Sequence, residues 1–241
     1  THAEYAARAL RAGKHVFVEK PLALDEAGLA EVEEAAAGSK GVLMVGFNRR
    51  FAPLALRLRQ ELSGRGPLVI TYRVNAGRIP RSHWTHDPEV GGGRIVGEVC
   101  HFVDFAMFLA GADPAGVEAV GIGGGSEPRE DSLAATLRLS DGSVAVIVYS
   151  ALGDPALPKE RVEVLGEAGA ATLEDFRELR LYRAGREERI AARRDKGHQT
   201  EIDRFLAGCR QGQQPWPVED MAAAMRATFA IRAAVAGASS G

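Results

Sequence analysis

Three stretches of the sequence combine residue types and spacings that could do chemistry, and the first is Glu19-Lys20-Pro21. These residues follow an apolar run at 15–18 that is typical of a buried strand. Only five of the 30 basic residues are lysines, and ligands bind at the carboxyl ends of parallel strands, where Lys20 would lie. From these three residues alone, an ordinary loop lysine that extends into water is still the better explanation.

The second stretch covers residues 91–104 and contains Glu98, His101 and Asp104, each three residues after the one before. In a helix this spacing places the three side chains on one side. A histidine there can act as a general base near neutral pH, and a carboxylate can fix its tautomer. Taken alone, a core histidine with a satisfied hydrogen bond explains the pattern slightly better. The glycines at 91–93 lack a GxGxxG arrangement, so we expect them to let the backbone approach a ligand or another loop.

The third stretch holds Arg78, His83 and Trp84. The ring of Trp84 could pack against a sugar ring, and Arg78 could bind a phosphate or carboxylate group. A surface loop with one packed tryptophan explains these residues equally well. A hydrolase that holds a metal on His83, His86 and His101 is a weak alternative, because prolines flank the first two and no carboxylate follows at a fixed spacing.

The elements that must position these residues follow from hydrophobic periodicity. Up to residue 50 the sequence alternates between helical and buried-strand patterns, with helices at about 1–13 and 25–37 and strands at 15–18 and 42–46. This order is typical of a parallel α/β sheet.

After residue 50 strands dominate. We expect helices at 51–62, 95–109, 197–209 and 219–235, and strands at 68–74, 133–139, 143–149, 162–165, 170–173 and 178–183. Asp141-Gly142 is a strong hairpin signal between two of these strands, so we expect an antiparallel sheet. The sequence therefore predicts a small α/β piece at 1–50 and a larger α+β domain at 51–241.

Composition excludes several classes of protein. The 241 residues carry 30 basic and 32 acidic side chains, so no excess of positive charge is available for a nucleic-acid backbone. No apolar run reaches the roughly 18 residues that cross a bilayer, and the first residues show no signal-peptide pattern. We therefore expect a soluble, cytoplasmic protein with no nucleic-acid or membrane partner. Two cysteines without a CxxC motif exclude a disulfide framework and a cysteine-built zinc site, and we expect buried thiols.

Taken together, these motifs resemble the Gfo/Idh/MocA family of nicotinamide-dependent oxidoreductases. The resemblance rests on Ala12-Gly-Lys-His-Val-Phe-Val-Glu-Lys-Pro21, on Gly91-Gly-Gly93, and on the helix with His101 and Asp104. More narrowly, the sequence is similar to the C-terminal module of the bi-domain oxidoreductases, which is fused behind an alcohol-dehydrogenase-like module. That similarity rests on Val45-Gly-Phe-Asn-Arg-Arg-Phe51, Asn75-Ala-Gly77, His83-Trp84, Gly97-Glu-Val-Cys-His-Phe-Val-Asp104 and Asp175-Phe-Arg177.

The resemblance implies a Rossmann-like domain that binds NAD or NADP, followed by a substrate domain built on an open, mainly antiparallel sheet covered by helices. Copies of the chain would associate through this sheet into a homo-oligomer. The resemblance also implies that Glu19, Lys20 and Pro21 contact the cofactor, that the Lys20–Pro21 peptide is cis, and that Lys20 lies beside the nicotinamide and the substrate.

His101 is the catalytic acid/base that the resemblance implies. Much of the family has an aspartate four residues before this histidine, where the present sequence has Gly97, so we expect Glu98 to supply the catalytic carboxylate. We expect the substrate to contact Arg78, His83, Trp84 and Asp104.

A complete member of the family carries a glycine-rich dinucleotide fingerprint on its first strand and an acidic ribose-binding residue about twenty residues later. This sequence contains neither, so we expect residues 1–50 to be the C-terminal remnant of the Rossmann domain and the isolated chain to bind NAD(P) weakly. The glycine-rich residues 121–125 follow an apolar run in the second domain, where we expect a loop or bulge.

The combined expectation is an enzyme that oxidises a secondary hydroxyl group of a sugar, a sugar nucleotide or a cyclitol with NAD or NADP, and that is weak or inactive without the missing half. The alternative from another class is a non-catalytic binding or oligomerisation module whose open sheet pairs with another copy.

Overall fold

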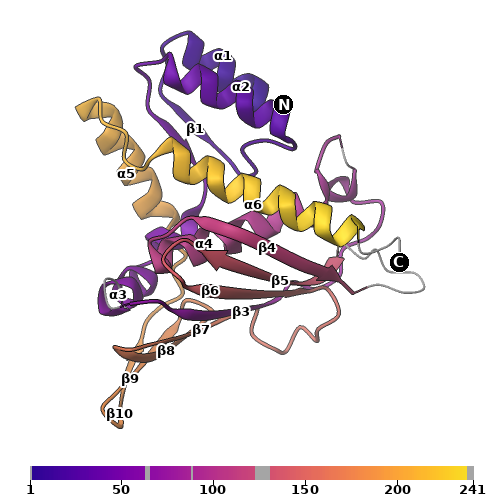
Figure 1. Cartoon of the computed structure of the whole chain (residues 1–241). Helices are drawn as coiled ribbons and strands as arrows, with labels where there is room; N and C mark the ends of the chain where they lie inside the picture. Colours follow the sequence, from indigo (N-terminus) through magenta and orange to yellow (C-terminus); the bar gives the residue numbers. More distant parts are fainter. Residues whose placement is uncertain (1, 63–65, 88, 123–130, 238–241) are drawn as a thin grey trace.

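A computed structural model describes residues 2–62, 66–87, 89–122 and 131–237 of the chain. A short parallel α/β unit comes first, and a large sheet with helices packed against it follows (Figure 1). This arrangement confirms the predicted fold class.

The α/β unit has two helices and two short strands in the predicted order. They are α1 (His2–Arg11), β1 (Val16–Val18), α2 (Glu26–Ala37) and β2 (Leu43–Val45). β1 and β2 pair in parallel, with Phe17 opposite Met44. The Asp25 carboxylate caps α2 by accepting a hydrogen bond of 2.8 Å from the Gly28 N–H. This unit places Lys20 two residues after the end of β1.

The second part of the fold is an eight-stranded sheet with the order β10-β9-β8-β7-β3-β6-β5-β4. Its strands are β3 (Val69–Asn75), β4 (Pro114–Gly121), β5 (Ser132–Leu139), β6 (Val144–Ser150), β7 (Glu160–Gly166), β8 (Gly169–Glu174), β9 (Glu178–Arg183) and β10 (Arg186–Ala191). Neighbouring strands are antiparallel except β3 and β6, which are parallel. The predicted hairpin at Asp141-Gly142 joins β5 to β6.

Four helices complete the fold. They are α3 (Pro53–Leu62), α4 (Cys100–Ala110), α5 (His198–Gln211) and α6 (Val218–Gly237). Figure 1 shows α4 and α6 on the same side of the sheet. Tyr72 of β3 and Ile147 of β6 are fully buried, whereas their neighbours Thr71 and Val146 belong to the opposite face of the sheet, which is less buried.

The helix predicted at 95–109 begins as a π-helical turn, Ile95–Val99, and continues as α4. A π-turn closes i→i+5 hydrogen bonds, so the residues before His101 do not follow α-helical spacing. Two 3₁₀ turns shape the same region, η1 (Asn48–Phe51) after β2 and η2 (Trp84–His86). A Cβ atom on Gly91 would lie 2.5 Å from the Thr85 Cα, so the close backbone approach predicted for this glycine is confirmed.

Other sequence-based expectations are met only in part. Cys100 is a buried free thiol, but Cys209 is only partly buried. Gly121 ends β4, while the rest of the predicted loop at 123–125 lies outside the described residues. No helix in the described ranges is long and apolar enough to cross a membrane. The domain boundary near residue 50 stays a prediction.

Candidate active site

A cavity of about 770 Å³ lies between the α/β unit, η2, the π-turn and the start of α4. Its polar wall is formed by Lys20, Arg49, Trp84, Glu98, His101 and Lys159. Its apolar wall is formed by Ala3, Pro21, Ala23, Leu24, Ala27 and Phe102. The cavity therefore brings Lys20 and His101, which are 81 positions apart in the sequence (101 − 20), to one site.

Lys20 is anchored across this cavity by the main chain. Its Nζ atom donates a hydrogen bond of 2.6 Å to the carbonyl oxygen of Gly97 in the π-turn. The Lys20–Pro21 peptide bond is cis, as the resemblance implied. The single hydrogen bond leaves two ammonium protons for a ligand, because a lysine has three donors.

His101 lies in the first turn of α4 and is 8% exposed. Burial lowers the pKa of its imidazole well below the usual value, and the positive charges of Arg49, Lys20, Lys196 and His198 lower it further. The ring is therefore neutral near neutral pH and can accept a proton. Its Nδ1 atom is sealed from solvent and has no hydrogen-bond partner in the described part of the chain.

In the described part of the chain, the two carboxylates expected near His101 bind arginines, and Nδ1 of His101 has no partner. Glu98 lies on the cavity wall, but its carboxylate accepts a hydrogen bond of 3.1 Å from Arg94 Nε. Asp104 is fully buried and forms an ion pair with Arg50, in which Arg50 Nε donates to Asp104 Oδ2 over 3.1 Å. The carboxylates of Glu98 and Asp104 thus have arginine partners in this structure, and Glu98 lies in a π-turn that does not follow α-helical spacing. A role for either carboxylate in orienting His101 stays a prediction.

The pair between Arg50 and Asp104 also excludes Asp104 from the cavity. Burial raises the pKa of this carboxyl group to about 6, although Arg50 opposes the shift. The guanidinium of Arg50 stacks on Trp216, with its Cζ atom 3.2 Å from the ring centroid. Asp104 is thus part of the packed interior and does not line the cavity, and its predicted contact with substrate stays a prediction.

The third predicted stretch contributes one side chain to the cavity. Trp84 lines it and is 62% exposed. His83 and Arg78 do not line it; Nδ1 of His83 lies 2.9 Å from Thr85 Oγ1, and Arg78 is an exposed residue of the same segment. Only Trp84 is therefore placed to meet a ligand there.

Glu19 also lies outside the cavity lining. Its carboxylate is close to the backbone after β2, because a Cβ atom on Gly46 would lie 2.9 Å from Glu19 Oε2. Of the three predicted cofactor contacts, Lys20 and Pro21 line the cavity and Glu19 does not.

Two residues of the cavity wall were not predicted from the sequence. Arg49 is 8% exposed and makes a two-pronged ion pair with Glu160, with Nε–Oε2 and Nη2–Oε1 distances of 2.8 and 3.0 Å. Lys159 is next to Glu160 in the sequence and lines the same cavity. The signals that could have found them are the paired arginines after β2 and the scarcity of lysine.

The residues that line the cavity fit a nicotinamide group. The apolar side chains beside Lys20 and His101 form a surface on which a planar ring can pack. Within the described ranges, no group of three histidine, cysteine or acidic residues could hold a metal ion. His86 is paired with Asp131, with an Nδ1–Oδ1 distance of 3.7 Å, and His83 is not part of the cavity, so the metal-dependent hydrolase has no structural support.

Comparison with known protein families gives two matches. Residues 1–47 match the family described as "Oxidoreductase family, NAD-binding Rossmann fold", and residues 66–172 match the "GFO/IDH/MocA C-terminal domain". The two matches lie on either side of η1, where Arg49 is located.

Individual proteins agree with these families. The chain is 29% identical over 250 residues to an inositol 2-dehydrogenase of Rhizobium meliloti, a match that covers 96% of this chain and 74% of the relative. It is 31% identical over 150 residues to a UDP-N-acetylglucosamine 3-dehydrogenase of Acidithiobacillus ferrooxidans, covering 62% of this chain and 45% of the relative. The solved structure of the latter enzyme superimposes with a TM-score of 0.82 at 27% identity, covering 98% of this chain and 76% of that one.

Proposed function

Because the chain belongs to the Gfo/Idh/MocA family of NAD-binding oxidoreductases, we propose that it takes part in the oxidation of a secondary hydroxyl group of a sugar, a sugar nucleotide or a cyclitol. The observation that carries this proposal is the convergence of Lys20 and His101 on one cavity. The named relatives act on inositol and on UDP-N-acetylglucosamine, which are substrates of the proposed classes.

In the proposed reaction His101 removes the hydroxyl proton of the substrate. The imidazole is neutral because burial and the surrounding cations disfavour its protonated form. NAD or NADP, when bound, supplies the hydride acceptor. The side chains thus contribute proton transfer and orientation, while the redox chemistry is the cofactor's.

Lys20 stabilises the negative charge that develops on the substrate oxygen as the proton leaves. Its hydrogen bond to the Gly97 carbonyl holds the ammonium at the cavity wall before a substrate arrives. A charged donor that is already in place needs no rearrangement during the reaction, which is why such groups stabilise transition states effectively.

The remaining walls of the cavity select the substrate. Pro21, Ala23 and Leu24 provide the apolar side for a nicotinamide ring, and Trp84 offers an exposed aromatic face to a sugar or cyclitol ring. Arg49 and Lys159 add hydrogen-bond donors for hydroxyl or phosphate oxygens.

The test uses the complete gene product that contains residues 1–241, with NAD and NADP and a panel that includes myo-inositol and UDP-N-acetylglucosamine. We expect reduced nicotinamide to form with at least one panel member. His101→Gln should lower turnover by about 10²- to 10⁴-fold, the usual contribution of a positioned acid/base. His15→Gln, which changes an exposed histidine that does not line the cavity, is the matched control and should leave turnover unchanged. Equal turnover in both variants would refute the assigned role of His101.

We also propose that copies of the chain associate through the sheet face that contains Thr71 and Val146. The valines of β6 lie on this face, and oppositely charged pairs such as Arg161 and Glu174 flank them. Such a surface can match a second copy of itself about a two-fold axis. Val146→Lys should shift the species observed in analytical ultracentrifugation from dimer or larger to monomer. A wild-type chain that sediments as a monomer contradicts the proposal.

A further inference from the structure

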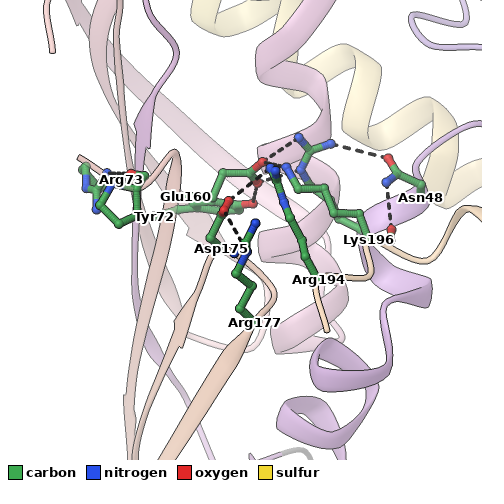
Figure 2. Close-up of polar contacts among 10 residues, drawn as sticks. Asn48, Tyr72, Arg73, Glu160, Asp175, Arg177, Arg194 and Lys196 are labelled. Atoms are coloured by element: carbon green, nitrogen blue, oxygen red, sulfur yellow. Dashed lines mark hydrogen bonds and ion pairs between the residues drawn. The ribbon is translucent and has the colours of Figure 1, made fainter. Parts of the chain in front are cut away.

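A buried cluster of charges lies directly behind the cavity, with Glu160 at its centre. The Glu160 carboxylate is 1% exposed and accepts hydrogen bonds from Arg49, from Lys196 and, over 2.5 Å, from the Tyr72 hydroxyl. Figure 2 shows Glu160 between Tyr72 on one side and Lys196 on the other. The cluster therefore contains two cations and one anion.

The geometry of Arg49 links this cluster to the proposed site. Its guanidinium lies over the Phe102 ring, with Cζ 5.0 Å from the centroid, and the residue lines the cavity together with His101. Both carboxylate oxygens of Glu160 accept hydrogen bonds from the Arg49 guanidinium, so the orientation of that group is fixed. The positive charge of Arg49 is therefore held in a fixed position at the cavity wall that it shares with His101.

We propose that Glu160 and Lys196 are positioning residues, which hold Arg49 at the cavity wall and together set the net positive charge that faces the His101 ring. The contacts among Arg49, Glu160 and Lys196 do not depend on the reaction. The consequence for turnover rests on the proposed function.

The charges around the cluster agree with this assignment. Burial alone would raise the pKa of Glu160, but Arg49 and Lys196 lower it to about 2, so the carboxylate is charged throughout the neutral range. Burial lowers the pKa of Lys196, and Glu160 counteracts that shift. The negative charge of Glu160 thus stabilises the charged forms of its neighbours Arg49 and Lys196.

Other charged groups also face His101, and they stay constant in the test. They are Lys20 after β1 and His198 at the start of α5. On the histidine's own segment, Glu98 is paired with Arg94 and Asp104 with Arg50. Because these groups are unchanged, variants of Glu160 and Lys196 report the effect of the cluster charge on the pKa of His101.

Three variants change that charge in steps. Lys196→Met removes one cation, so it should raise the pKa of His101. Glu160→Gln removes the anion, so it should lower that pKa. The double variant Glu160→Gln/Lys196→Met removes one charge of each sign and should return the pKa close to its wild-type value.

The matched control is Arg161→Met. Arg161 follows Glu160 on β7, but its side chain is 46% exposed and belongs to the opposite face of the sheet. This variant removes the same amount of charge as Lys196→Met at a neighbouring position, so a general effect of net charge would move both.

The measurement is an NMR titration of the histidine imidazole signals of the 241-residue chain, without cofactor or substrate. His101→Gln identifies the His101 signal among the six histidines, and far-UV circular dichroism defines the pH range in which each variant is folded. We expect Lys196→Met to raise the titration midpoint of His101 by about half a pH unit or more, as removal of a nearby charge predicts. Arg161→Met should leave it unchanged.

Equal midpoints in Lys196→Met and the wild type overturn the proposal, and so does an equal shift in Arg161→Met. Glu160→Gln leaves a buried arginine without its counter-ion and can unfold the chain. If it does, the comparison of Lys196→Met with Arg161→Met is sufficient to test the proposal. In the complete gene product, the acid limb of the kcat/KM profile should follow the NMR midpoints. If the midpoints move but His101→Gln keeps full turnover, the proposed function fails while this inference stands.

Discussion

The Nζ atom of Lys20 and the carbonyl oxygen of Gly97 are joined by a hydrogen bond of 2.6 Å, so a side chain that follows β1 is anchored on the turn that leads into His101. Lys20→Met removes this cation. We expect turnover of the complete gene product to fall by about 10²- to 10³-fold, as loss of one donor to a developing oxyanion does. Lys40→Met, an exposed lysine of the same α/β unit, is the control; equal loss in both would contradict the role of Lys20.

The ion pair between Arg50 and Asp104 should behave as one buried unit. Removing either partner leaves a buried group without its counterpart, so Arg50→Met or Asp104→Asn should each lower the free energy of unfolding by about 3–5 kcal/mol. The double variant should cost less than the sum of the two. Urea unfolding of the four proteins measures this, and strictly additive losses would show that the two side chains do not stabilise each other.

The effect of Arg50→Met should also depend on pH. Burial raises the pKa of Asp104 to about 6, so in mild acid this carboxyl group is protonated and needs no counter-ion. The loss of stability in Arg50→Met should therefore be smaller at about pH 5 than at about pH 8. The same loss at both values would indicate that Asp104 keeps its charge.

Glu201 of α5 is a buried carboxyl group whose ionisation should destabilise the fold, whereas ionisation of a carboxyl group that pairs with a cation stabilises it. It is 2% exposed, and its Oε1 atom has no hydrogen-bond partner in the described ranges. Burial raises the pKa of its carboxyl group to about 8, and the negative charges of Glu19 and Asp104 add to this shift. The folded chain therefore holds a proton that the unfolded chain releases above the usual glutamate pKa of 4.5. Stability should fall as the pH rises from about 4.5 to about 8.

Glu201→Gln removes this titration. We expect a gain on the order of 2 kcal/mol in the free energy of unfolding at about pH 8, and little change at about pH 5. Thermal unfolding at the two pH values measures it. Glu188→Gln, an exposed glutamate of β10, is the matched control, and a gain of equal size in that variant would rule out a specific effect at Glu201.

Trp84 should affect substrate binding and not stability. Its side chain is 62% exposed on the cavity wall, so Trp84→Ala removes a contact surface without leaving a hole in the core. We expect KM for a sugar-type substrate to rise by roughly tenfold, which corresponds to about 1.4 kcal/mol, with an unchanged melting temperature. Trp216, which is 5% exposed, gives the contrast, because Trp216→Ala should lower the melting temperature.

The secondary-structure elements could be predicted from the sequence, because they depend on the pattern of neighbouring residues. Periodicity located the helices and most strands, and the Asp141-Gly142 turn located a hairpin. The meeting of Lys20 and His101 was implied by the family resemblance, because the local patterns alone favoured an ordinary loop lysine and a core histidine. The spacing of three that placed Glu98 beside His101 assumed a continuous α-helix, whereas the chain forms a π-turn at Ile95–Val99.

The cluster around Glu160 could not have been predicted in this way. Arg49 and Glu160 are 111 positions apart, and Tyr72 and Glu160 are 88 apart. No spacing rule connects these residues, because Tyr72 meets Glu160 through the pairing of β7 with β3, and Arg49 reaches it from η1. The ion pair between Arg50 and Asp104 joins residues 54 positions apart, so local spacing could not predict it either.

The neighbours Arg49 and Arg50 share a charge and a side-chain type, yet one binds Glu160 at the sheet and the other binds Asp104 beneath Trp216. They diverge because a 3₁₀ turn advances the chain by a third of a revolution per residue. We expect the insertion or deletion of one residue between β2 and η1 to break both ion pairs, because it would rotate both arginines away from their acids. The length of this connection therefore matters as well as its composition, because it sets which acid each arginine meets.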